Sequence, residues 1–276
     1  MHLSVKRGGS RAVALALVFA FAATGAFALG NKEATPAKTP GAAAPGTQAL
    51  PPGPAVVAST SWVGGIAEAA GANVTRILAP VELRHPPEYD FRVSDIQYAA
   101  GADMVVWAGY EKFMKKLFES VDVPEAKRLA LYTDNTPPRL RQEVEKTAAA
   151  LGTLDRFALW APRLDELAAR LQAGALRADA AGTRVAVHTH YRALAAWLGY
   201  TIVTEITMGE MTPSRLQEIL ALKPDLVIDN WHMPSGQSLD GLVPRYVQLI
   251  NFPGNGGTAT LLDVLSHNGK LLGLLE

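Results

Sequence analysis

Three residues with metal-binding side chains stand at comparable places in the chain: His85, His188 and Glu210. Each follows a run of apolar residues that is typical of a strand, and each comes before a turn or a helix. In open α/β sheets, ligands bind outside the carboxyl ends of the strands. Imidazole nitrogen and carboxylate oxygen are donors that zinc and manganese accept. The three positions therefore predict a metal site in which distant parts of the chain meet.

The fourth donor of such a site is left open by the sequence. His190 is a candidate ligand because it shares a face with His188 if the strand continues, although the two side chains diverge if a helix begins there. Asp134, Asn251 and a water molecule are the other candidates. We expect His232, which stands in a Trp-His-Met-Pro segment, to be structural or to hydrogen-bond to a ligand.

The composition narrows the chemistry further. The chain has 276 residues, 49% of them hydrophobic, which suffices for one large domain or two small ones with a sizeable core. It has no cysteine, which excludes thiolate ligands, disulfides and a lipid anchor on cysteine. The 26 basic and 26 acidic residues balance, and no basic stripe suggests a nucleic-acid partner.

Residues 1–28 have the three parts of a secretory signal. These are the basic residues Lys6, Arg7 and Arg11, the apolar run 12–23, and Ala-Phe-Ala at 26–28. The pattern predicts export to the periplasm or another extracytoplasmic compartment. The alternative is an uncleaved signal anchor, although the apolar run is shorter than the roughly 20 residues that a spanning helix needs.

The rest of the chain divides into four segments. Residues 29–54, rich in Pro, Ala, Thr and Gly, are predicted to be a disordered linker. Residues 55–137 and 182–276 each alternate strand-like and helix-like runs, which predicts two βα lobes with parallel sheets. Residues 138–181 carry only helical signals and are expected to form a long, rigid backbone helix that links the lobes.

The expected elements follow from hydrophobic periodicity. The strands are 55–59, 74–78, 103–107, 185–187, 202–205, 226–228 and 246–250. The helices are 61–70, 93–100 with Ser94 as its cap, 110–120, 139–151, 163–176, 191–198, 213–222 and 260–272. In the helical region Leu164, Leu167, Ala168 and Leu171 fall on one face.

The two lobes leave one cleft between them. His85 and the loop after Trp107 are expected to face this cleft from the first lobe. His188, Glu210 and the loop 230–232 are expected to face it from the second. The metal site is therefore predicted to lie between the lobes.

These segments resemble the metal-specific solute-binding proteins of ABC importers that serve zinc and manganese uptake. His-Pro-Pro-Glu-Tyr-Asp at 85–90, followed by Val-Ser-Asp-Ile at 93–96, is similar to the family's first ligand loop. The spacing from His188 to the Leu-Gly pair at 198–199 is similar to the family's spacing from its strand-end His to the Gly that ends the next helix. Glu210 with Thr-Pro-Ser at 212–214 resembles the family's Glu-Pro-Ser segment. The likeness extends from residue 55 to the end.

The chain departs from the family's pattern at two places. The segment 131–136 has no histidine where the family usually carries one, and Asn251 stands where the family often has an aspartate. The stretch 223–228 is also similar to the sibling receptors for cobalamin and siderophores, which share the helical-backbone fold.

The resemblance implies a monomeric receptor, not an enzyme, that binds Zn²⁺ or Mn²⁺ through His85, His188, Glu210 and His190. Its partner would be the membrane permease of an ABC importer. One alternative is a receptor for a chelated metal such as haem, a siderophore or a corrinoid. Another is a zinc hydrolase built on His188 and His190, because catalytic zinc sites use three protein ligands and a water.

Overall fold

The computed structural model describes residues 51–83 and 89–276 of the chain. His85, the predicted signal peptide and residues 29–50 of the predicted linker lie outside the described residues. Within the described ranges, no helix has both the length and the apolar character that a membrane span requires.

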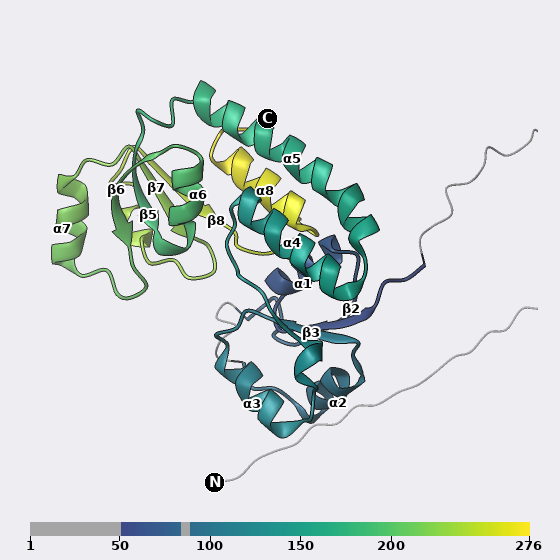
Figure 1. Cartoon of the computed structure of the whole chain (residues 1–276). Helices are drawn as coiled ribbons and strands as arrows, with labels where there is room; N and C mark the ends of the chain where they lie inside the picture. The colour runs from purple at the N-terminus through teal and green to yellow at the C-terminus, as the bar shows by residue number, and fades with distance from the viewer. Residues whose placement is uncertain (1–50, 84–88) are drawn as a thin grey trace, which may run out of the picture. The chain divides into compact units, whose positions relative to one another are not determined.

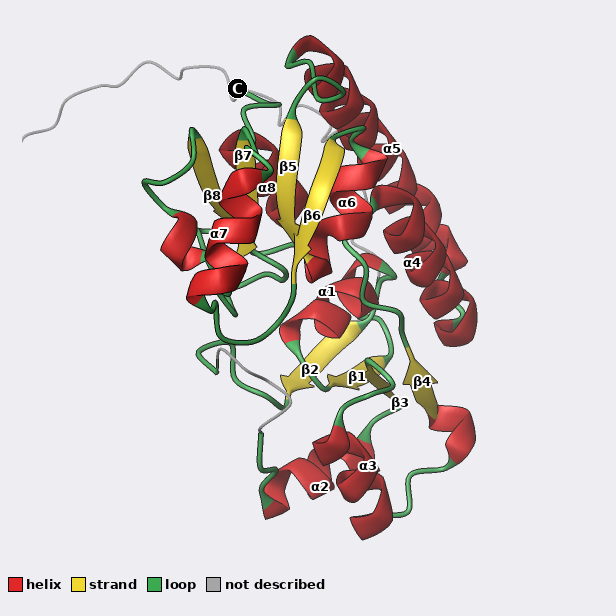
Figure 2. Ribbon diagram, turned by 90° about the vertical axis from the view of Figure 1, so that its left-hand side faces the viewer, coloured by secondary structure: helices red, strands yellow, loops and turns green. Residues whose placement is uncertain are grey.

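The first sheet contains four parallel strands in the order β2-β1-β3-β4. They are β1 (Ala55–Ala58), β2 (Asn73–Ile77), β3 (Met104–Trp107) and β4 (Arg128–Ala130). The connecting helices are α1 (Ser61–Ala69), α2 (Val93–Gly101), α3 (Lys112–Ser120) and the short 3-10 helix Glu125–Lys127. Both views show α2 and α3 on the side of this sheet that faces away from α1 (Figures 1 and 2).

The second sheet repeats this arrangement with the order β6-β5-β7-β8, again all parallel. Its strands are β5 (Arg184–His188), β6 (Thr201–Ile206), β7 (Leu226–Asn230) and β8 (Arg245–Leu249). Its helices are α6 (Arg192–Trp197), α7 (Pro213–Ala221), α8 (Leu261–Leu271) and the 3-10 turns Thr189–Tyr191 and Gln237–Leu239. The prediction of two βα units with parallel sheets is confirmed.

The segment between the sheets is helical, as predicted, and residues 138–181, all of them described, contain no strand. It forms α4 (Pro137–Leu151) and the 24-residue α5 (Leu154–Arg177), the long helix along one side of Figure 1. The predicted face is confirmed, because Leu164, Leu167 and Leu171 are buried.

These buried side chains of α5 belong to one hydrophobic core, which also contains residues of α1, α4 and α8 and of the inner strands of both sheets. The two sheets are therefore joined by packing as well as by the chain itself. Two smaller clusters fill the opposite faces of the sheets, one beneath α2 and α3 and one beneath α7.

Three details of the predicted elements were wrong. The helix expected at 163–176 begins at Leu154, because Phe157 and Ala161 extend its buried stripe and Pro162 does not end it. The N-cap of α2 is Arg92 rather than Ser94, and the buried Asp95 accepts the Arg92 backbone N–H at 2.8 Å. Strand β4 was not predicted, since three residues without a β-branched side chain give little signal.

Gly174 tests how closely α5 packs against the C-terminal segment. A Cβ on Gly174 would lie 2.1 Å from the Leu274 carbonyl oxygen, which is backbone and cannot turn aside. We expect Gly174→Ala to lower the free energy of unfolding by about 1–3 kcal/mol, the usual cost of overpacking. Thermal or urea denaturation measures the change.

Gly101→Ala is the matched control. No described atom lies within 4 Å of a Cβ built at this position in α2. Alanine should therefore leave stability unchanged or raise it by up to about 1 kcal/mol. Equal stability of the two variants would contradict the close packing of α5 on Leu274.

Candidate functional site

A cavity of about 450 Å³ lies where loops from both sheets meet. Its walls consist of residues that follow the carboxyl ends of the strands, the edge at which α/β proteins bind ligands. From the first sheet come Thr60, Trp62, Ala108, Tyr110, Glu111, Tyr132 and Thr133. From the second come His190, Met208, His232, Met233, Asn251 and Phe252.

His188 is the last residue of β5 and is completely buried. Its ring Nδ1 accepts the backbone N–H of His190 at 3.2 Å, so the side chain caps the 3-10 turn that follows. Its Nε2 is buried and has no hydrogen-bond partner among the described residues. A buried polar atom without a partner costs about 1–3 kcal/mol, and such exceptions often mark functional sites.

The neutral His188 ring carries its proton on Nε2, because Nδ1 acts as the acceptor. A metal can bind only a nitrogen lone pair. Coordination through Nε2 would move the proton to Nδ1, break the 3.2 Å bond and set this new N–H against the His190 backbone N–H. Each buried N–H left unpaired costs about 1–3 kcal/mol, which the metal–imidazole bond would have to offset.

His190 brings a second imidazole to the cavity wall. Its ring centroid lies 4.9 Å from that of His188. Asn230, at the end of β7, accepts the His232 backbone N–H with Oδ1 at 2.9 Å, so its Nδ2 faces His190 Nδ1 at 3.0 Å. The structure thus places His188 and His190 side by side, and Asn230 orients the second ring.

The carboxylate of Asp229 shapes the loop that presents His232 and Met233. It is fully buried and accepts the backbone N–H groups of Asn230, Ser235 and Gly236 and the hydroxyl of Tyr246, at 2.7–3.2 Å. The His232 ring, 3% exposed, stacks on Phe252 with a centroid distance of 3.8 Å. The loop is therefore held by the buried Asp229 carboxylate and by the stacking on Phe252, and His232 and Met233 line the cavity.

Glu111 is a cavity residue that the sequence analysis missed. Its carboxylate is 1% exposed and accepts the Ser59 hydroxyl and the Ala108 N–H, both at 2.6 Å. Burial raises its pKa, while these two hydrogen bonds oppose the rise. The available signal was an acidic residue directly after the Gly109 turn that ends β3, in the loop that had been assigned to the cleft.

The other predicted donors differ in their position relative to the cavity. Glu210 is exposed and lines a separate hollow beside Met208 and Arg215, outside the main cavity. Asn251 lines the cavity, and its Oδ1 is buried without a described partner. Asp134 is not part of the lining and accepts the Thr136 N–H at 2.7 Å. Within the described residues, no group of three His, Asp or Glu side chains stands close enough to hold a metal alone.

No family model and no curated protein sequence matches the chain. Several solved structures share its fold. The periplasmic zinc binding protein TroA from Treponema pallidum has 15% identity and a TM-score of 0.59, over 81% of this chain and 100% of its own. FpvC from Pseudomonas aeruginosa, in complex with Ni²⁺, has 18% identity and a TM-score of 0.63, over 79% of this chain and 94% of its own.

A further likeness is to the laminin binding protein Lmb of Streptococcus agalactiae, described as an adhesin with metal-transporting activity. It has 16% identity and a TM-score of 0.60, over 80% of this chain and 100% of its own. These structures confirm the predicted fold, two βα lobes with parallel sheets linked by a long helix. Sequence identities of 15–18% establish a shared fold but not a shared function.

The buried His188 should make the stability of the metal-free protein depend on pH. Burial, with a smaller contribution from His190, lowers the pKa of His188 from 6.5 to about 4, against the opposing effect of Asp229. Between these values the unfolded chain binds more protons than the folded one. The stabilisation is therefore complete above pH 6.5 and is lost as the pH falls toward 4.

Urea denaturation from neutral pH down to about pH 4.5 measures this loss. His188→Gln keeps a polar side chain of similar size and removes the titrating group. We expect the variant to show a shallower fall in stability over this range than the wild type does. Equal slopes would mean that His188 is not held neutral by the fold.

Proposed function

We propose that this protein is an extracytoplasmic receptor that captures a divalent transition metal, zinc first and manganese next, and delivers it to the permease of an ABC importer. The observation that carries the proposal is the buried His188 with its unpaired Nε2, adjacent to His190 at the wall of the cavity. Two neutral imidazoles are donors that favour zinc.

The solved structures of the same fold support this assignment. TroA is described as zinc binding, FpvC appears in complexes with Ni²⁺ and Mn²⁺, and the protein from Candidatus Liberibacter asiaticus appears with Mn²⁺ and Cd²⁺. We propose that the cargo binds in the cavity at the carboxyl ends of the two sets of strands. His188 and His190, at the end of β5, would supply imidazole nitrogens as metal ligands.

The remaining parts of the proposal follow from the same role. A receptor that feeds a permease works outside the cytoplasm, which accords with the predicted signal at residues 1–28. His188 and His190 are proposed ligands, together with His85, which lies outside the described residues. Glu210 remains a proposed ligand as well, because its hollow adjoins the cavity and shares Met208 with it. We propose that the protein acts as a monomer and as a carrier rather than a catalyst.

Metal analysis tests the proposal. The chain without residues 1–28, purified without chelators, should hold roughly one equivalent of zinc or manganese. Replacing His188 and His190 by alanine should weaken zinc binding in calorimetry by more than about tenfold, because each loses an imidazole donor. Zinc should also raise the melting temperature of the wild type, as any ligand specific for the folded state does.

His267→Ala is the matched control, since this histidine lies in α8 and outside the cavity lining. It should bind zinc as the wild type does. A wild type that binds neither zinc nor manganese would refute the proposal. Turnover of ester or phosphoester substrates by the zinc-loaded protein, lost in His188→Ala, would favour the hydrolase alternative instead.

A further inference from the structure

The cavity is much larger than a metal ion requires. It measures about 450 Å³, whereas one water molecule occupies about 30 Å³ of the liquid. Its size falls within the range of roughly 300–1,000 Å³ that is typical of pockets for small organic molecules. A bare metal ion would leave most of this space unfilled.

The walls are chemically suited to a flat organic molecule. Aromatic and methionine side chains dominate the lining, with Trp62, Tyr110 and Tyr132 from the first sheet and Met208, Met233 and Phe252 from the second. Tyr110 and Tyr132 are each 59% exposed and Met208 is 56% exposed. Large side chains left open to solvent around one cavity mark a ligand-binding surface.

The polar groups beside the cavity also fit an organic ligand. Trp62 Nε1 and Asn251 Oδ1 are buried, and neither has a hydrogen-bond partner among the described residues. An ion could bind the asparagine oxygen, but no cation can accept a hydrogen bond from an indole N–H. A ligand that satisfies Trp62 must bring an oxygen or nitrogen acceptor.

The described residues that line the cavity offer few metal donors. Among the described residues no three His, Asp or Glu side chains form a group that could hold a metal. His188 and His190 form a pair, and Glu111 has both oxygens engaged by Ser59 and Ala108. Structural zinc sites have four donors, and a chelator can supply donors of its own beside those of the protein.

We propose that the cargo is a metal already bound to a small, planar heteroaromatic chelator, an inference that rests on the metal-receptor function proposed above. The chelator supplies donors of its own and packs between the aromatic walls. The imidazoles of the pair His188 and His190 fill coordination positions that the chelator leaves open.

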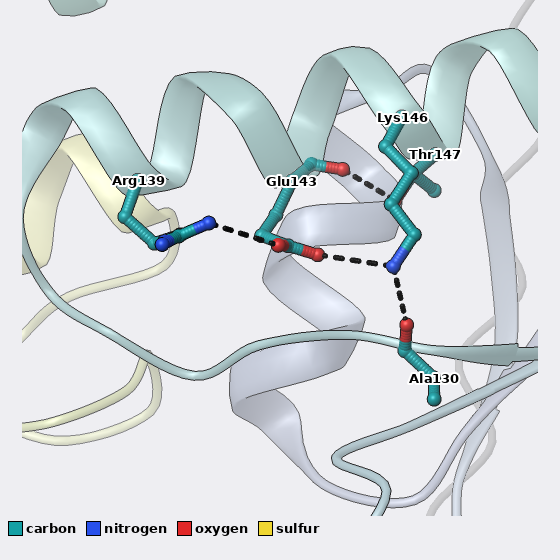
Figure 3. Close-up of polar contacts among 5 residues, drawn as sticks. All are labelled: Ala130, Arg139, Glu143, Lys146 and Thr147. Carbon is teal, nitrogen blue, oxygen red and sulfur yellow. Dashed lines mark hydrogen bonds and ion pairs between the residues drawn. The ribbon is translucent and has the colours of Figure 1, made fainter.

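The wall formed by Tyr132 is held in place from behind. Buried Glu143 of α4 lies 4.0 Å from Arg139 and 3.4 Å from Lys146, and Lys146 donates to the Ala130 carbonyl at 2.7 Å (Figure 3). The Arg139 guanidinium lies over the Tyr132 ring, 5.0 Å from its centroid. These contacts fasten the end of β4 to α4, and the guanidinium supports one face of the ring, which lowers the conformational entropy lost when a ligand stacks on it.

Calorimetry with three probes tests the inference: zinc alone, phenanthroline alone, and the equimolar zinc–phenanthroline complex. Phenanthroline is planar and heteroaromatic and leaves coordination positions of zinc free. We expect the complex to bind at least about tenfold more tightly than zinc alone, and phenanthroline alone to bind more weakly than the complex. Tyr132→Ala should weaken the complex about three- to tenfold, the value of one aromatic stacking contact, and leave zinc alone within about twofold.

Tyr98→Ala is the matched control. Tyr98 is also an exposed tyrosine with an arginine over its ring, Arg76 at 5.2 Å, but it lies on α2 and outside the cavity. It should bind the complex as the wild type does.

The outcomes separate the two proposals. If zinc binds alone and phenanthroline only removes it, the chelator inference fails and the metal-receptor function stands. If neither zinc nor the complex binds, both fail. Equal affinity for the complex in the wild type and Tyr132→Ala, or equal affinity for phenanthroline with and without zinc, also overturns the inference.

Discussion

The rest of the structure depends on one hydrophobic core that continues from the first sheet to the second. The buried stripe of α5 packs with residues of α1, α4 and α8 and with inner strands of both sheets. A helix in such a core cannot move by itself, because interiors are close-packed and transmit strain. The core therefore fixes where the carboxyl ends of the two sets of parallel strands come together.

This meeting of strand ends explains why the cavity is built almost entirely of loop residues. The backbone groups of the strands are paired within the sheets, whereas the residues directly after the strands can turn their side chains toward a ligand. His188 shows the transition well, because its backbone completes β5 while its ring caps the next turn and leaves Nε2 unpaired. The free-energy cost of leaving Nε2 unpaired is offset by the packing of the surrounding core.

The two sides of the cavity contribute different chemistry. The second sheet brings the imidazoles, oriented by Asn230 and by the Asp229 carboxylate that organises the adjacent loop. The first sheet brings aromatic surface and the carboxylate of Glu111. A ligand that touches both sides would have to combine metal affinity with an apolar surface.

The sequence by itself determined the local structure. Apolar runs alternating with helical periodicity predicted the βα order, the parallel sheets and the helical segment between them, because these patterns arise from neighbours in the chain. The position of His188 at a strand end followed in the same way. Segments with weak local signals, such as β4 and the first turns of α5, were missed.

Only the tertiary structure decided which side chains share a site. Glu210 follows a strand as His188 does, yet it is exposed and lines an adjoining hollow, while Glu111, which the sequence analysis did not single out, is buried at the cavity wall. Periodicity reports the direction of a side chain relative to its own strand or helix. It carries no information on how far that element lies from others, and this distance is set by packing around the shared core.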